Sequence, residues 1–278
     1  MKKINRRSFL AAAGLTAAAL ALTACGGSAS STASSTASSA ASSEAASTSA
    51  AAELTTVEAG KLTMATNAAF PPYEMTTDAG EFEGIDIDTA KAIAEKLGLE
   101  LQIDDMDFDA ALLSVQQGKA DIVMAGVTVT DARKAVMDFS DSYATGIQSI
   151  IVPEGSDITS PDDLAGKKIG TQRGTTGYIY CSDDFGDDAV VAYDDGLTAV
   201  QALNNGQVDA VVIDNAPAKE FVAANPGLVI LDTSYAEEDY AIGLAKGSAL
   251  EDAVNAALEE LKADGTLQSI VDKYITAE

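Results

Sequence analysis

The sequence Ala125-Gly126-Val127-Thr128-Val129-Thr130-Asp131-Ala132-Arg133 follows an apolar run, residues 121–124, that predicts a buried strand. Its glycine would let a ligand approach the backbone closely. Thr130 or Asp131 can cap a short helix that carries Arg133. A strand end with N–H groups, hydroxyls and a guanidinium suits a carboxylate, because the arginine fork can hold both carboxylate oxygens. The stretch therefore predicts a carboxylate site, and the alternative is an ordinary strand-to-helix turn with a surface arginine.

A similar pattern occurs a second time further along the chain. The sequence Val115-Gln116-Gln117-Gly118-Lys119-Ala120-Asp121-Ile122-Val123 resembles Leu203-Asn204-Asn205-Gly206-Gln207-Val208-Asp209-Ala210-Val211. Both contain a helix end, a glycine, two further residues, an aspartate and an apolar strand. Five residues after each aspartate stands a candidate ligand group, Gly126 or Asp214. Because open α/β sheets bind ligands at the carboxyl ends of their strands, the repeat predicts two lobes that present these groups to one cleft.

Strands and helices alternate along the rest of the sequence. Apolar runs predict the strands, and glycines or capping residues mark the helix ends. This alternation predicts an α/β protein with sheets rich in parallel pairs. Strands are expected at residues 61–66, 100–103, 168–170, 189–193, 208–213, 228–231 and 240–244, and helices at residues 85–97, 108–117, 174–182, 197–205 and, after the capping box Ser248-Ala249-Leu250-Glu251, 248–263.

The composition excludes several classes of function. The chain has 278 residues, a formal net charge of −26, two cysteines and no histidine. The length allows one or two domains. The absence of histidine removes the commonest general base and excludes Ser-His-Asp and Cys-His catalysis. The acidity argues against nucleic acid, because there is no basic run to neutralise phosphates.

No metal or cofactor is expected. Asp105, Asp107 and Asp109 have the spacing of the first ligands of a calcium loop. However, Ala110 replaces the glycine that such a loop requires, and Gln116 stands where the bidentate glutamate belongs. We expect the aspartates to cap the helix that begins at Phe108, and no phosphate-binding glycine motif is present.

The N-terminus predicts a targeting segment, residues 1–24. Paired lysines and arginines precede an apolar run that is too short to span a bilayer comfortably, and Asn5-Arg6-Arg7-Ser8-Phe9-Leu10 also looks like a twin-arginine signal. The sequence Leu22-Thr23-Ala24-Cys25-Gly26 then resembles the lipobox of bacterial lipoproteins, in which the cysteine is acylated; an ordinary secretory signal is the alternative. Residues 25–56 are expected to form a disordered Ser/Ala tether. With Cys25 lipidated, Cys181 has no disulfide partner and is expected to be a small buried residue.

The sequence from about Lys61 to Tyr274 resembles the amino-acid family of extracellular solute-binding proteins, which deliver substrates to ABC importers. The resemblance implies a two-lobed, type II periplasmic-binding-protein-like α/β fold, with a ligand cleft between lobes joined by two hinge strands. The hinges would fall near residues 142–148 and 239–245. Lobe 1 would then comprise residues 57–145 and 245–278, and lobe 2 residues 146–244. The motifs that carry the resemblance are residues 65–74, Gly84-Ile85-Asp86-Ile87-Asp88, residues 125–133, Asp138-Phe139-Ser140, Gly174-Thr175-Thr176 and Asp209-Ala210-Val211.

Carried over by position, the resemblance implies how the backbone groups of an amino acid are held. Arg133 would pair with the α-carboxylate, and Thr128 with the N–H and hydroxyl of Thr176 would add hydrogen bonds, favoured by a helix N-terminus. Asp214 and the carbonyl of Gly126 would hold the α-ammonium. By itself, Asp214 could equally cap a helix over residues 216–224.

The same resemblance places the ligand's side chain. Phe70 and Phe108 would sandwich it, although such residues taken alone are more often part of a core. Asn67, Tyr73 and Gln172 would lie near its distal end. The predicted ligand-binding residues are Asn67, Phe70, Tyr73, Phe108, Ala125, Gly126, Thr128, Arg133, Gln172, Thr175, Thr176 and Asp214.

One residue departs from the pattern of the family. Members that prefer basic amino acids usually carry an acidic residue where Asn67 stands. The amide therefore favours a neutral ligand that is polar or small, while Arg173 beside the pocket leaves an acidic ligand open. The expected partners are an amino acid, the permease of an ABC transporter and, through the lipid on Cys25, the outer face of the bacterial membrane. The protein is expected to be a monomer.

Two other functions stay open at this point. Dehydratases that act on prephenate-like acids share the two-lobed architecture and need a positioned acid and an arginine, both of which the sequence contains. The lipobox, the tether and Asp214 favour binding without chemistry. The second alternative is a sensory ligand-binding domain, which usually continues into transmembrane and signalling segments that we do not expect after Glu278.

Overall fold

The computed structural model describes residues 54–232 and 234–275. The predicted signal peptide (residues 1–24), the lipid-bearing Cys25 and the tether up to residue 53 lie outside the described residues. Among the helices that are described, none combines the length and the apolar character that a membrane span requires.

The first part of the chain follows the predicted alternation of strands and helices. Helix α1 has the predicted bounds, and Gly98 ends it in the left-handed conformation with φ 69°. Strand β5 is two residues longer than expected, since it continues to Asp105. The elements are β1 (Lys61–Thr66), β2 (Ala69–Phe70), β3 (Glu74–Thr76), β4 (Phe82–Glu83), α1 (Ile85–Leu97), β5 (Glu100–Asp105), α2 (Phe108–Gln116), β6 (Ile122–Val123), α3 (Asp131–Lys134) and β7 (Met137–Pro153).

The second part repeats the alternation and ends in two helices. Its elements are the 3-10 turn η1 (Pro161–Leu164), β8 (Ile169–Gln172), α4 (Thr176–Phe185), the 3-10 turn η2 (Asp187–Ala189), β9 (Val190–Tyr193), α5 (Gly196–Asn204), β10 (Ala210–Asp214), α6 (Asn215–Ala224), β11 (Leu228–Ile230), β12 (Ala236–Ala245), α7 (Glu251–Ala263) and α8 (Thr266–Tyr274).

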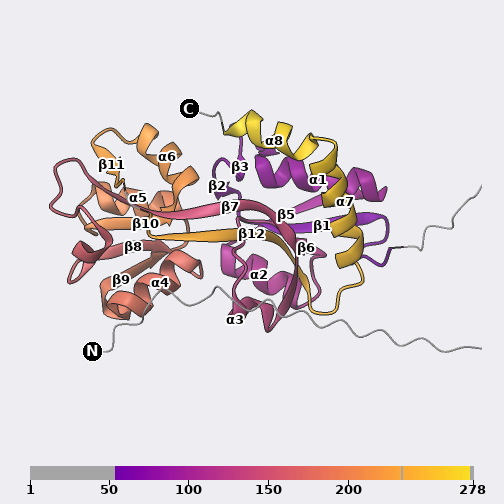
Figure 1. Ribbon diagram of the computed structural model, residues 1–278, viewed down its shortest axis with the longest axis horizontal. Helices are drawn as coiled ribbons and strands as arrows, with labels where there is room; N and C mark the ends of the chain where they lie inside the picture. Colours follow the sequence, from indigo (N-terminus) through magenta and orange to yellow (C-terminus); the bar gives the residue numbers. More distant parts are fainter. Residues whose placement is uncertain (1–53, 233, 276–278) are drawn as a thin grey trace, which may run out of the picture. The chain divides into compact units, whose positions relative to one another are not determined.

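Two long strands, β7 and β12, join the two lobes (Figure 1). They pair with each other in antiparallel fashion from Ala236 opposite Gln148 to Ala245 opposite Met137. Strand β12 also pairs with β6 in the first lobe, whereas β7 pairs with β10 in the second. Within the described residues the main sheet is therefore one continuous path, β5-β1-β6-β12-β7-β10-β8-β9. The two-lobed type II architecture is confirmed, while the residue boundaries of the lobes stay a prediction.

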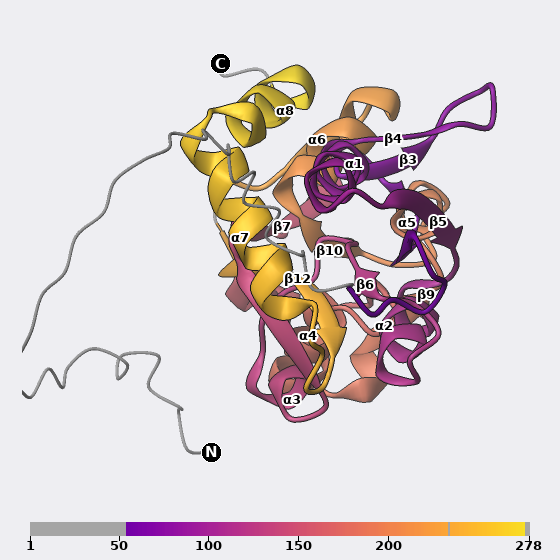
Figure 2. The same ribbon diagram turned by 90° about the vertical axis from the view of Figure 1, so that its right-hand side faces the viewer.

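Parallel pairs of the main sheet lie in both lobes, the hinge strands add its antiparallel pairs, and β2-β3-β4 form a separate antiparallel sheet. Strand β1 lies between β5 and β6, parallel to both, and β8 lies parallel to both β10 and β9. Helices α7 and α8 return to the first lobe after β12, where they lie beside α1 (Figure 2). The carboxyl ends of β1 and β6 in one lobe, and of β8 and β10 in the other, all lead into the residues predicted to bind the ligand.

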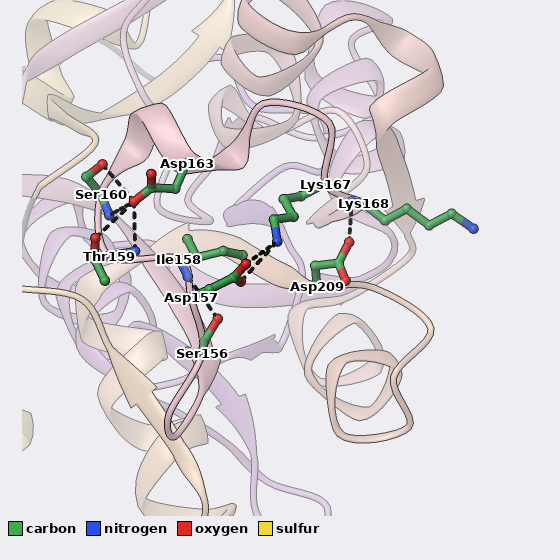
Figure 3. A network of polar contacts seen from close by, with 9 residues as sticks. All are labelled: Ser156, Asp157, Ile158, Thr159, Ser160, Asp163, Lys167, Lys168 and Asp209. Atoms are coloured by element: carbon green, nitrogen blue, oxygen red, sulfur yellow. Dashed lines mark hydrogen bonds and ion pairs between the residues drawn. The ribbon is translucent and has the colours of Figure 1, made fainter.

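In both copies of the internal repeat, the aspartate side chain accepts hydrogen bonds from backbone N–H groups. Asp121 accepts hydrogen bonds from the backbone N–H groups of Val57 (2.7 Å) and Thr63 (2.8 Å), at the start of β1. Asp209 accepts one from the N–H of Lys168 (2.7 Å), just before β8 (Figure 3). In each copy the aspartate that precedes one strand ties down the beginning of its parallel neighbour.

The structure corrects two local predictions and agrees with a third. The capping box at Ser248 is wrong: α7 begins at Glu251, and the Ser248 hydroxyl accepts from the N–H of Leu250 at 3.2 Å, which is a turn before the helix. Asp107 occupies the N-cap position of α2 without a side-chain cap, and Asp105 instead accepts from the N–H of Ala68 at 2.8 Å. Cys181 is fully buried, as predicted, and burial raises the pKa of its thiol to about 12.

Candidate ligand-binding site

A cavity lies where the strand ends of the two lobes meet. The first lobe contributes residues from the β1–β2 turn, α2, the loop after β6 and α3, and the second contributes residues from β8, the start of α4 and the end of β10. Of the predicted ligand-binding residues, all except Tyr73 line it. The lining residues are Asn67, Phe70, Glu74, Phe108, Ala125, Gly126, Thr128, Arg133, Gln148, Gln172, Thr175, Thr176, Ile213, Asp214 and Tyr240.

Gly126 lets the chain turn beside the Phe70 ring at the cavity. Its φ of 54° lies in the left-handed region, and a Cβ there would lie 2.9 Å from the Phe70 ring. The N–H of Gly126 donates to the carboxylate of Asp86 at 3.0 Å. The backbone is thus held in a form that only glycine adopts without strain, next to Ala125, which also lines the cavity.

Arg133 is a buried cation that joins the two lobes. The hydroxyl of Thr130, one of the two capping residues that the sequence offered, caps α3 by accepting from the N–H of Arg133 at 3.2 Å. The guanidinium donates to the carbonyls of Thr128 (2.7 Å) and Gly174 (3.2 Å) and lies 5.3 Å from the centre of the Phe108 ring. Burial lowers the pKa of Arg133, and the nearby carboxylate of Glu238 opposes this shift. A buried guanidinium with donors left over is suited to an anion.

Asp214 is a buried anion that lines the other side of the cavity, and it also caps a helix. It is the N-cap of α6, since it accepts from the N–H of Ala216 at 3.0 Å. Its second oxygen accepts from the N–H of Ile147 (2.8 Å) and the hydroxyl of Tyr240 (2.9 Å). Burial raises the pKa of Asp214 to about 6. A cation placed beside this carboxylate would stabilise its charged form.

Two amides meet across the cleft at the β1 and β8 strand ends. The side-chain amide of Gln172 donates to the Asn67 side-chain oxygen at 2.8 Å and also lies 3.2 Å from the carbonyl of Asp194. Asn67 in turn donates to the carbonyl of Met106 at 3.0 Å. The pair is neutral, and it joins residues from the two lobes at the end of the cavity that the sequence assigned to a ligand's side chain.

The aromatic residues divide between the cavity and its support. Phe70 and Phe108 line the cavity. Tyr73 does not: its ring stacks on Phe70 at 5.8 Å and meets Tyr240 edge-on at 5.4 Å. Tyr73 therefore packs behind Phe70 and Tyr240, which line the cavity, and does not line the cavity itself.

Two buried carboxyl groups, Glu74 and Asp86, face each other under the first lobe's side of the cavity. Both are fully buried, and each is within hydrogen-bond reach of the other. Asp86 accepts from the N–H of Gly126 and, at 2.8 Å, from the hydroxyl of Tyr143, so its charge is the better supported of the two. In the described structure both oxygens of Glu74 and one of Asp86 have no other partner. Burial, and then the charge of Asp86, raise the pKa of Glu74 well above its ordinary value, so Glu74 holds the proton.

Comparison with known proteins identifies the family. Residues 62–277 match the family described as bacterial extracellular solute-binding proteins, family 3. The chain is 32% identical to a probable histidine-binding protein of Neisseria gonorrhoeae, over 99% of this chain and 98% of that protein. The chain belongs to this family of solute-binding proteins.

Solved structures of similar proteins agree with this assignment. The arginine-, lysine-, histidine-binding protein ArtJ of Geobacillus stearothermophilus is 34% identical, with a TM-score of 0.75 over 78% of this chain and 96% of its own. An ancestral arginine-binding protein solved with bound glutamine is 42% identical, with a TM-score of 0.75 over 78% of this chain and 99% of its own.

This family 3 protein is therefore an extracellular, amino-acid-binding component of ABC transporters, and it is not an enzyme, because its relatives are substrate-binding proteins. The dehydratase alternative is not favoured.

Sequence reasoning missed several residues at the site of this solute-binding protein. Glu74, Gln148, Ile213 and Tyr240 line the cavity, and Glu238 lies directly behind it. A signal for Glu238 was available, because side chains alternate along a strand and Glu238 shares a face with Tyr240. Both are buried, whereas the residue between them is exposed.

Proposed function

We propose that this protein captures a neutral amino acid, polar or small, as a zwitterion and delivers it to the permease of an ABC importer. The observation that carries the proposal is the pair formed by Arg133 and Asp214. One buried cation and one buried anion, supplied by different lobes, line the same cavity. A free amino acid carries the two opposite charges close together, and charge-assisted hydrogen bonds to each contribute about 1.5–3 kcal/mol.

The preference for a neutral side chain is supported by the groups beyond the zwitterion site. The amides of Asn67 and Gln172 are uncharged, and Glu74 is held in its protonated form against Asp86. A cationic side chain in this place would require Glu74 to ionise within a buried pair of like charges. The relatives do not decide the matter, since the named ligands of the solved structures include both arginine and glutamine.

A thermal-shift screen against the twenty amino acids, followed by calorimetry, tests both parts of the proposal. A ligand at one hundred times its dissociation constant adds about 2.7 kcal/mol to stability, which raises the melting temperature measurably. We expect one or a few neutral amino acids to do so. Stabilisation by none of the twenty would contradict the capture of amino acids, and stabilisation by arginine or lysine alone would contradict the neutral preference.

The variant Glu74→Gln separates a neutral ligand from a cationic one. A glutamine side chain has the shape of a protonated glutamate and likewise offers a donor and an acceptor, so we expect the affinity for a neutral amino acid to change by less than about threefold. A guanidinium ligand that pairs with an ionised Glu74 would lose at least about tenfold. The half-buried Glu83→Gln on neighbouring strand β4 is the matched control.

The N-terminal sequence supports an anchor on the membrane. We infer that Cys25 carries the lipid, that the Ser/Ala-rich residues 25–56 connect it to the folded lobes, and that the protein acts as a monomer on the outer face of the membrane. Replacing Cys25 by serine should move the protein from the membrane fraction into the soluble fraction. An unchanged membrane fraction for Cys25→Ser would rule out the lipid anchor.

A further inference from the structure

Glu238 places a buried carboxylate directly behind the cavity, where three donors converge on one of its oxygens. Oε2 accepts from the hydroxyl of Thr128 at 3.0 Å, from the hydroxyl of Thr176 at 2.9 Å and from the amide of Gln148 at 3.0 Å. All three donors belong to residues that line the cavity, whereas Glu238 is 5% exposed and is not among the described lining residues. The carboxylate thus contacts the ligand-binding surface only through its neighbours.

The contacts around Glu238 fix where the two hydroxyl protons point. A hydroxyl carries one proton, and an ionised carboxylate can only accept. The two hydroxyl oxygens are also 3.3 Å apart, so either threonine could donate to the other. In every arrangement of these contacts, both protons are used among Thr128, Thr176 and Glu238. The hydroxyls therefore present lone pairs to the cavity.

Lone pairs at this position favour a ligand group that donates hydrogen bonds. An ammonium is such a group, because it has three donors and no acceptor. A carboxylate in the same place would have to take a hydroxyl proton away from Glu238. That would remove a partner from a carboxylate that is only 5% exposed. The charged and titratable groups around Glu238 are Arg133, Tyr180, Asp214 and Tyr240.

We propose that Glu238 is a positioning residue that makes the site selective for acids carrying an α-ammonium group over otherwise identical acids without one. By accepting the protons of Thr128 and Thr176, it turns both hydroxyls into acceptors for the ammonium beside Asp214. The ligand's carboxylate is then left to Arg133 and to backbone N–H groups, without the contact from the Thr176 hydroxyl that the family resemblance implies. The inference rests on the proposed zwitterion site, and it adds the means by which that site rejects simple carboxylic acids.

The test compares amino acids with analogues in which hydrogen replaces the amino group. The probes are L-alanine with propanoate, L-serine with 3-hydroxypropanoate, L-glutamine with 4-carbamoylbutanoate and L-arginine with 5-guanidinopentanoate, measured by calorimetry. The readout is the ratio of dissociation constants, analogue over amino acid, for each pair that the wild-type protein binds. We expect a wild-type ratio of at least about one hundred, because two or more charge-assisted hydrogen bonds are lost with the ammonium.

In Glu238→Gln the ratio is expected to fall about tenfold, because the new amide can donate and one threonine proton becomes free to turn towards the ligand's carboxylate. The matched control is Glu237→Gln, the same substitution at the adjacent exposed position of β12, which should keep the wild-type ratio. An unchanged ratio in Glu238→Gln, with both affinities falling in parallel, would mean that Glu238 is merely structural and would overturn the proposal.

A second pair of variants keeps the test independent of whether Glu238→Gln folds. Thr176→Val removes one of the two acceptors, and Thr176→Ser retains it. We expect Thr176→Val to weaken the amino acid about tenfold and leave its analogue nearly unchanged, while Thr176→Ser behaves like the wild type. Equal losses for the amino acid and its analogue would contradict the proposal. If the wild-type protein binds none of the amino acids, the proposed function itself fails, and the two failures are thus distinguished.

Discussion

The charged residues at the cavity of this protein have partners of their own, and this governs how they respond to pH and to substitution. Arg133 donates to two backbone carbonyls, and Asp214 accepts three hydrogen bonds. Such contacts hold the two side chains in place in the ligand-free protein. Binding then adds hydrogen bonds to groups that are already oriented, so less conformational entropy is lost.

Arg133→Ala should remove amino-acid binding without unfolding the protein. We expect the dissociation constant to rise at least about one hundredfold, because a bidentate charge-assisted contact is lost. The control is Arg173→Ala, since Arg173 is exposed, pairs with Asp194 at 3.5 Å and is not among the lining residues. Calorimetry and melting temperature measured on both variants check this. Affinity within a few-fold of the wild type in Arg133→Ala would remove Arg133 from the carboxylate site.

The raised pKa of Asp214 predicts that binding weakens in acid. An ammonium needs the ionised carboxylate, and burial places the pKa at about 6 instead of 3.8. The association constant should therefore fall by up to about tenfold per pH unit below about pH 6. Asp214→Asn should bind weakly at pH 7.5 and lose this slope. Asp86 also titrates at about 6, but it is retained in the variant, so a full slope that persists in Asp214→Asn would assign the pH dependence to Asp86 instead.

The same shift has the opposite sign for stability. The folded state binds a proton at Asp214 more tightly than the unfolded state does, so this group stabilises the fold increasingly as pH falls from about 6 towards 3.8. A fall in affinity together with an unchanged or higher melting temperature over this range would separate titration of the site from acid unfolding.

The sequence predicted most individual residues of the site because strand ends and motifs mark them. Gly126, Arg133 and Asp214 follow apolar runs, and the structure places all three at the cavity. Tyr73 lies in the same motif as Phe70, but local sequence does not tell which ring of a stacked pair faces a ligand. Glu238 was missed because its hydrogen-bond partners come from elements distant in sequence, although its alternation with Tyr240 along the strand was a usable signal.

At the scale of the elements, the repeated aspartate ties the start of one strand to the start of its parallel neighbour in each lobe. The two copies differ in burial, since Asp121 is 5% exposed and holds two N–H groups, whereas Asp209 is exposed and holds one. Leaving a buried backbone donor without a partner costs about 1–3 kcal/mol, whereas water can replace a partner at the surface.

Asp121→Ala should therefore destabilise the protein more than Asp209→Ala does. We expect a loss of about 2–4 kcal/mol in the free energy of unfolding for Asp121→Ala and no more than about 1 kcal/mol for Asp209→Ala. Urea unfolding of the two variants, matched in chemistry and in position within the repeat, measures the difference. Equal losses, or a larger loss for Asp209→Ala, would show that the aspartates do not act through these backbone contacts.

The ends of helices were predictable where the local backbone conformation favours one type of residue. Gly98 ends α1 at the predicted residue because a left-handed C-terminal residue favours glycine. The capping box at Ser248 fits the pattern equally well, yet the serine forms a turn and α7 starts later. Serine hydroxyls can bond to the backbone in either arrangement, and tertiary packing makes the choice.

At the scale of the whole molecule, the hinge strands β7 and β12 connect the lobes. The ends of β1 and β6 therefore lie opposite the ends of β8 and β10, and the cavity lies between them. Alternating elements and the internal repeat were enough to predict two α/β lobes. The long antiparallel pairing of β7 with β12, which turns the two sheets into one path, was not predictable from local patterns, because strand pairing depends on distant residues. Contacts such as Gln172 with Asn67 and Arg133 with Gly174 then join the lobes across the cavity.

A crystal structure of the protein with the amino acid that stabilises it most tests the proposed binding mode directly. We expect the ligand in the cavity between the lobes, with its carboxylate within hydrogen-bond distance of the Arg133 guanidinium and its ammonium against Asp214 and the hydroxyls of Thr128 and Thr176. A ligand bound elsewhere, or bound in the reverse orientation with its carboxylate on the threonine hydroxyls, would contradict it.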